Sequence, residues 1–100
     1  MNFVAVIGII ESVKKERKQT LLSIKVEKNE TETDNNQWFE IIPVIIDNNE
    51  FKDDIEFLNS GDIIGIKGRI RKRNEKIILF CEKLQNFCID NYKISVNNQS

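Results

Sequence analysis

Alternating apolar and polar residues predict five β-strands in this chain. Successive side chains of a strand point to opposite faces, so an apolar residue at every second position marks a strand with one buried face. Such alternation, or a nearly continuous apolar run, occurs in residues 3–10, 20–28, 38–46, 62–71 and 76–84. Phe51, Ile55 and Leu58 instead follow a helical spacing, which predicts one short helix within residues 47–59.

Residues with special backbone properties refine this prediction. Asn48 or Asn49 can cap the predicted helix, and Gly61 can adopt the left-handed conformation that ends one. Gly8 interrupts the first strand and predicts a bend, a bulge or a close approach of two backbones. Pro43 cannot donate a hydrogen bond to a neighbouring strand, so the third strand should lie at a sheet edge or a bulge near this residue.

The polar segments between the strands predict their connections. Residues 13–20 predict a hairpin connection and residues 72–75 a turn, whereas residues 29–37 contain no apolar side chain and predict a mobile loop. Five strands with one helix between the third and the fourth are the order of an all-β OB-fold, a five-stranded Greek-key barrel. We therefore expect one OB-fold domain over residues 1–89 and a polar tail, or a weak sixth strand, over residues 90–100.

The third strand has two largely apolar faces, so alternation alone does not decide which one is buried. One face carries Trp38, Glu40, Ile42 and Val44, and the other carries Phe39, Ile41, Pro43 and Ile45. The charge of Glu40 favours the first face as the outer one, which places Trp38 at the surface. Burial of Trp38 in the core is the alternative, since large aromatic side chains dominate protein cores.

The fourth strand is the most informative stretch, because its two faces differ completely. Ile64, Ile66, Gly68 and Ile70 fall on one face, and Lys67, Arg69, Arg71 and Arg73 fall on the other. A polar mixture would suffice to keep an outer face in water, so four cations at alternate positions favour an extended anionic ligand. Their spacing of about 6.6 Å is comparable with neighbouring phosphates of a stretched single strand. A solvated, charged strand is the alternative.

Charge is segregated along the chain, although the net charge is only −1. Basic residues cluster at 14–18 and 67–76, and acidic residues at 27–34 and 47–56. Binding of a polyanion must therefore come from a local surface and not from bulk charge. No apolar run reaches the length of about 20 residues that a membrane span requires, and the N-terminus lacks the features of a signal peptide, so we expect a cytoplasmic protein without membrane contact.

Catalytic and metal-binding chemistry lacks its usual residues. The chain contains no histidine, and Cys81 and Cys88 match no zinc or redox spacing, so two reduced thiols are expected. No nucleophile with its base, metal cage or glycine-rich phosphate loop is recognisable. We expect a protein that is not an enzyme and needs no cofactor or metal.

Four stretches resemble the single-stranded DNA-binding protein family, in the same order and spacing. They are residues 1–9, 37–42, 60–71 and 82–87. Residues 38–45 also resemble primosomal protein B, a relative of the same fold that lacks the family's C-terminal tail. The resemblance implies that Trp38 stacks on a base and that Arg71 and Arg73 contact the nucleic-acid backbone.

The chain also departs from the family. Val44 and Glu75 stand where the family often has an aromatic residue, which implies weaker binding. Residues 90–100 lack the acidic tip through which the family recruits replication proteins, so such partners remain an open expectation.

Together, these features predict a non-catalytic protein that coats or protects single-stranded DNA in replication, repair or recombination. Lys67, Arg69, Arg71 and Arg73 would track phosphates while Trp38 stacks on a base. Lys14, Lys15 and Lys25 would extend the groove, or belong to a solvated hairpin. Single-stranded RNA is an alternative ligand, and a primosome-type protein-interaction module with weak or no nucleic-acid binding is an alternative function.

The first strand predicts self-association. Phe3 to Ile10 is apolar on both faces, and a monomer of 100 residues has little with which to cover the outward face. The resembling family forms dimers and tetramers by joining such strands. We expect a homodimer or homotetramer through this strand.

Overall fold

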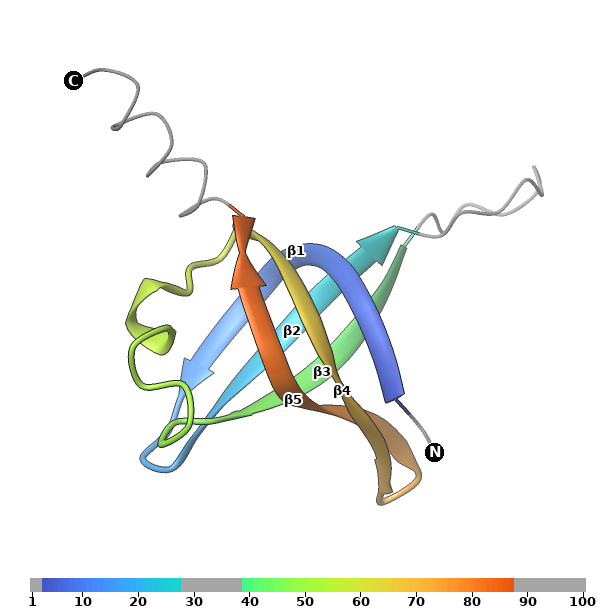
Figure 1. Cartoon of the computed structure of the whole chain (residues 1–100). Helices are drawn as coiled ribbons and strands as arrows, with labels where there is room; N and C mark the ends of the chain where they lie inside the picture. The colour runs from blue at the N-terminus through green and yellow to red at the C-terminus, as the bar shows by residue number, and fades with distance from the viewer. Residues whose placement is uncertain (1–2, 28–38, 88–100) are drawn as a thin grey trace.

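The fold is a five-stranded barrel, seen in a computed structural model that describes residues 3–27 and 39–87 (Figure 1). Its elements are β1 (Phe3–Lys15), β2 (Gln19–Glu27), β3 (Phe39–Asp47), the 3₁₀ turn η1 (Ile55–Phe57), β4 (Ile63–Arg73) and β5 (Lys76–Asn86). The five predicted strands and the helical segment between the third and fourth are confirmed. The predicted loop at 29–37, the tail at 90–100, Trp38 and Cys88 lie outside the described residues.

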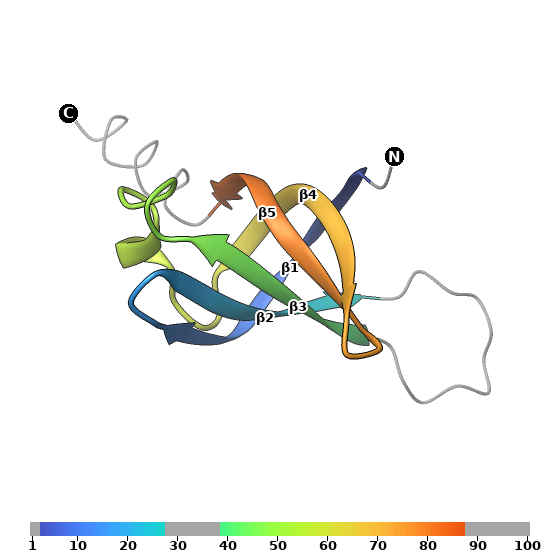
Figure 2. The same cartoon turned by 90° about the horizontal axis from the view of Figure 1, so that it is seen from below.

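The strands close in the order β1-β2-β3-β5-β4, with β1 pairing both β2 and β4 (Figure 2). Neighbours are antiparallel except β3 and β5, whose parallel ladder joins only Val44 to Leu79 and Ile45 to Phe80. Pro43 comes directly before this ladder, where β3 pairs with β2 alone. The predicted sheet edge near Pro43 is therefore confirmed, and the missing N–H explains why the ladder begins after it.

The core is built from inward-facing alternate residues of all five strands, together with Leu58 from the segment between β3 and β4. Its buried members are Ile10, Leu22, Ile24, Val44, Ile46, Leu58, Ile64, Ile66, Leu79 and Cys81. Even-numbered residues of β3 thus face inward, and the described outer face carries Phe39 and Ile41, which are 42% and 43% exposed. The inference that the face shared with Glu40 is the outer one was wrong. That inference relied on the charge of Glu40, which lies near the exposed start of β3. The apolar residues further along the strand decide which face is buried, and Val44 and Ile46 face the core.

Strand β1 is longer than the alternation predicted, and it is strongly curved (Figure 1). It continues to Lys15, with a register shift between Ile10 and Ser12, so the connection to β2 spans only residues 16–18. Gly8 confirms the expected close approach, because a Cβ there would lie 2.5 Å from the carbonyl oxygen of Lys25. Lys14 and Lys15 are compatible with a strand because both side chains are exposed, and Val13 packs against the core.

Residues 47–59 form turns and the single 3₁₀ turn η1, which is the predicted short helix. The periodicity still identified the inward residues, since Leu58 is buried and Phe51 and Ile55 pack against the core. The predicted Asn caps were wrong: the side chain of Asp47 accepts the backbone N–H of Asn49 at 2.8 Å. Short polar side chains compete with helical hydrogen bonds in this way, which limits the helix to one turn.

Two turns position β4. Gly61 has a φ of +96°, as expected, but it belongs to the turn before β4, where its N–H donates to the carbonyl of Ile10 at 2.7 Å. At the far end, Asn74 and Glu75 have φ of 53° and 66°, typical of a two-residue hairpin turn. The turn is thus shorter than the predicted 72–75, and β4 keeps Arg73 in its ladder with β5. Within the described ranges, no helix is long and apolar enough to cross a membrane.

Candidate nucleic-acid interface

The outer face of β4 carries four exposed cations, here called the basic stripe: Lys67, Arg69, Arg71 and Arg73. Ile64, Ile66 and Gly68 are buried on the opposite face, as the alternation predicted. The four cations occupy alternate positions of β4, which stays paired with β5 as far as Arg73. Such a row can follow an extended chain of phosphates.

Aromatic rings from both neighbouring strands lie beside the stripe. The register places Phe3 of β1 and Phe80 of β5 opposite Arg69. Lys67 Nζ lies 5.2 Å from the centroid of Phe3, and the Cζ atoms of Arg71 and Arg73 lie 5.4 and 5.8 Å from the centroid of Phe80. These distances are within the range of cation–π contacts.

These rings change the chemistry of the surface. A cation can pair with a phosphate while an exposed ring offers a flat apolar surface for a base, and single-strand binders combine both. Phe3 is 44% exposed and Phe80 is half-buried. Sequence reasoning missed both, although each alternates with inward-facing residues, Phe3 with Val4 and Phe80 with Leu79.

Lys25 is not brought next to the stripe. It pairs with Ile9 of β1, two strands away from β4, and the exposed side chains of Ile7 and Ile9 lie between. Its Nζ lies 4.1 Å from the centroid of Phe39, so it forms a second, separate pair of cation and ring. Trp38 directly precedes Phe39 in the chain but lies outside the described residues.

Lys14 and Lys15 are also separate from the stripe. Both views place the β1–β2 hairpin and the β4–β5 hairpin at opposite sides of the barrel (Figures 1 and 2). Lys14 Nζ lies 3.8 Å from the carboxylate of Glu16. The predicted continuous groove over both hairpins is therefore not what the barrel presents.

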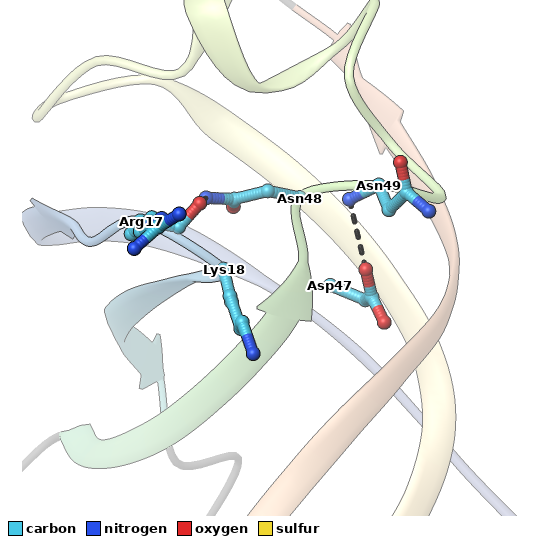
Figure 3. A pocket seen from close by; sticks show the side chains of 5 residues that line it. All are labelled: Arg17, Lys18, Asp47, Asn48 and Asn49. Atoms are coloured by element: carbon cyan, nitrogen blue, oxygen red, sulfur yellow. Dashed lines mark hydrogen bonds between the residues drawn. The ribbon is translucent and has the colours of Figure 1, made fainter.

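Hydrogen bonds from Asn48, which directly follows β3, hold the turn of the β1–β2 hairpin in place (Figure 3). Asn48 Nδ2 donates to the carbonyls of Glu16 and Arg17 at 2.7 and 3.3 Å, and the buried hydroxyl of Thr20 donates to Asn48 Oδ1 at 2.7 Å. Arg17 and Lys18 border the resulting hollow together with Asp47. The polar groups here serve mainly to hold the turn.

Comparison with known proteins finds the architecture but no sequence family. No family model matches the chain, and no curated protein sequence does. Among solved structures, Plasmodium falciparum SSB in complex with ssDNA matches with a TM-score of 0.67 and 14% identity over 86% of this chain and 94% of that one. A small single-stranded DNA-binding protein from Mycoplasma pneumoniae matches with a TM-score of 0.63 and 20% identity over 86% of this chain and 93% of that one. A dimeric PriB N-terminal domain from Thermoanaerobacter tencongensis matches with a TM-score of 0.59 and 22% identity, covering 85% of this chain and 94% of that one.

The chain has an OB-fold. The predicted all-β barrel is confirmed by this likeness and by the closed order of five strands. The structural neighbours are those that the sequence motifs resembled, and at these identities the likeness is one of fold.

The OB-fold leaves an apolar surface beside the stripe, here called the β1 patch: Ile7, Ile9 and Ile63. Ile7 is 63% exposed, and Ile9 pairs with Ile63 across β1 and β4. The outward face of the first strand is thus apolar and exposed, as predicted. Contiguous apolar surface of this kind commonly marks an interface.

The OB-fold core contains the one thiol among the described residues. Burial, with the carboxylates of Glu50, Asp54 and Glu82 nearby, raises the pKa of Cys81 to about 12. Cys81 therefore stays a neutral thiol, which donates to the carbonyl of Lys83. Within the described ranges, no group of acidic, histidine or cysteine side chains could hold a metal ion.

Proposed function

We propose that this OB-fold binds single-stranded DNA through the basic stripe and the rings of Phe3 and Phe80, without catalysis. The observation that carries the proposal is the alternation of exposed cations and aromatic surface along β4 and its two neighbours. The likeness to SSB in complex with ssDNA supports it at the level of fold.

Each part of the surface has a separate role in this function. Lys67, Arg71 and Arg73 pair with phosphates along the strand, and bases stack on the exposed ring faces. Each stacked base contributes about 1–3 kcal/mol, and the net charge of −1 adds no general attraction for DNA, so the affinity is moderate. Because the cations pair with phosphates, the affinity depends strongly on the salt concentration. The biological role is to coat or protect single strands in the cytoplasm during replication, repair or recombination.

Self-association completes the proposal. The β1 patch joins a second copy across a two-fold axis, giving a homodimer or a homotetramer. The PriB domain described as dimeric supports this arrangement. Sedimentation should give a species larger than 11.7 kDa, and Ile7→Glu should shift it toward the monomer. A monomeric parent chain at tens of micromolar would contradict the interface.

A salt titration tests the binding. Fluorescence anisotropy of labelled oligo(dT) should rise on addition of the protein, and log affinity should fall linearly with log salt, by about 0.7 per phosphate contact. Three or four contacts predict a slope of about −2 to −3. The same length of oligo(rU) decides between DNA and RNA. Electrostatic binding is strongest at low salt. If no binding is seen at about 50 mM salt, the protein-interaction module is favoured instead.

A further inference from the structure

Within the described ranges, Glu82 is the acidic residue that contacts the basic stripe. Its Oε2 lies 2.9 Å from Nε of Arg69, and the two side chains are 40% and 54% exposed. Lys67, Arg71 and Arg73 form no ion pair in this part of the chain. Arg69 is therefore the cation of the stripe that already forms an ion pair, with the carboxylate of Glu82.

The backbone places Glu82 at this position. Lys67 pairs with Lys83 while Gly68 pairs with Cys81, so Glu82 is the extra residue of a bulge in β5. A Cβ on Gly68 would collide with the carbonyl of Phe80, so the bulge depends on a glycine in the facing strand. The bulge leaves both Glu82 and Lys83 exposed, because it interrupts the alternation of inward and outward side chains.

A carboxylate and a phosphodiester use the same donors of a guanidinium group. We infer that Glu82 limits the affinity of the stripe by holding Arg69 in an internal ion pair, which a phosphate must displace. This role rests on the function proposed above, since it exists only if the stripe binds a single strand. After displacement, the free carboxylate remains beside the strand and repels it. Bound strands are thereby released more readily than from a fully basic stripe.

Charge removal at two positions of the same hairpin tests this role. Glu82→Gln should bind oligo(dT) about 3- to 10-fold more tightly at low salt. Its salt slope should steepen by up to about 0.7, because Arg69, which Glu82 occupies in part of the parent complexes, then contacts a phosphate in all of them. Glu75→Gln is the matched control, since Glu75 is an exposed carboxylate in the hairpin turn without an ion pair in the described part of the chain. It removes the same charge and should leave the slope unchanged.

The Arg69→Gln background separates displacement from general repulsion. There, Glu82→Gln should gain no more affinity than Glu75→Gln gains in the same background. Equal effects of the two Glu variants in the parent chain, or weaker binding by Glu82→Gln, would overturn the role of Glu82. If the parent chain itself fails to bind oligo(dT), the proposed function fails instead. Melting curves of each variant show whether a changed affinity reflects a changed fold. Glu82→Ala, which also removes the carboxylate, should bind more tightly, as Glu82→Gln does.

Discussion

The two basic hairpins of this barrel look alike in sequence and differ in what surrounds them. In the β1–β2 hairpin, Asn48 bonds to the turn carbonyls and Lys14 lies near Glu16. In the β4–β5 hairpin, Arg71 and Arg73 lie over the ring of Phe80 and are exposed. Within the described residues, only Arg69 of this hairpin is paired with a carboxylate, that of Glu82. The first arrangement fixes a turn, whereas the second presents charge on an apolar platform.

A count of cations therefore does not locate a binding surface. A cation beside carboxylates and backbone acceptors is already partly neutralised, and an added phosphate gains little from it. A cation over a ring keeps its charge available, and the ring adds stacking area. The neighbours of each charge therefore separate the two hairpins.

The largest effect is expected from charge reversal in the β4–β5 hairpin. Arg71→Glu with Arg73→Glu should weaken oligo(dT) binding about 100-fold at low salt and reduce the salt slope by about 1.4, because two phosphate contacts are lost. The fold should persist, since both side chains are exposed.

The matched control reverses the same charge in the other hairpin. Arg17→Glu with Lys18→Glu should lower the affinity far less, by long-range repulsion alone, with the slope retained. Anisotropy titrations at four salt concentrations measure both variants. Equal losses in the two hairpins would show that only net charge matters and would remove the distinction between them.

Trp38 provides the next test. If it stacks on a base, oligo(dT) should quench its emission and Trp38→Ala should weaken binding by about 1–3 kcal/mol with little loss of stability. Since Trp38 is the only tryptophan, intrinsic fluorescence reports this residue alone. A blue-shifted emission indifferent to DNA, with about 3–5 kcal/mol of folding stability lost on truncation, would assign the ring to the core.

Removal of one stripe ring should have a smaller effect. Phe80→Ala should weaken binding by about 1 kcal/mol, at the lower end of the range for a stacked base, because the ring is half-buried beside Arg71 and Arg73. Phe57→Ala removes an exposed ring on η1, away from the stripe, and should leave the affinity unchanged. The same anisotropy titration compares the two, with melting curves as the control for folding.

The smallest effect on binding is expected from Asn48→Ala, although this change should lower the stability of the fold. Asn48→Ala removes the acceptor of the buried Thr20 hydroxyl and the donor to Glu16, which should cost about 1–3 kcal/mol of unfolding free energy. Urea denaturation measures this loss. Affinity for oligo(dT) should remain unchanged, because the bonds lie in the other hairpin. A parallel loss of binding would mean that the two hairpins are coupled.

Alternation along a single strand predicted more of the site than any other signal. It placed the four stripe cations outward and Ile64 and Ile66 inward, because every second residue of a strand shares a face. The positions of Phe3 and Phe80 beside the stripe depend on register between strands, which one strand's pattern does not contain. The separation of Lys14 from the stripe likewise follows from the path of the barrel.

Helical spacing predicted the secondary structure least well in residues 47–59, where polar side chains compete with the backbone for hydrogen bonds. Residues 47–59 carry the spacing of a helix, and their apolar members do reach the core. Asp47 and Asn48 instead bond to turns, so only η1 is helical. The bulge at Glu82 was also beyond the sequence, because it arises from the fit of two strands at Gly68.

Backbone amide shifts in ¹⁵N-labelled protein titrated with oligo(dT) would show which hairpin contacts the strand, since they observe both hairpins in one experiment. The largest changes should fall on Lys67 to Arg73, with Phe3 and Phe80 included, and the amides of residues 14–18 should move little. Changes concentrated on residues 14–18, or spread evenly around the barrel, would contradict the assignment of the basic stripe as the binding surface.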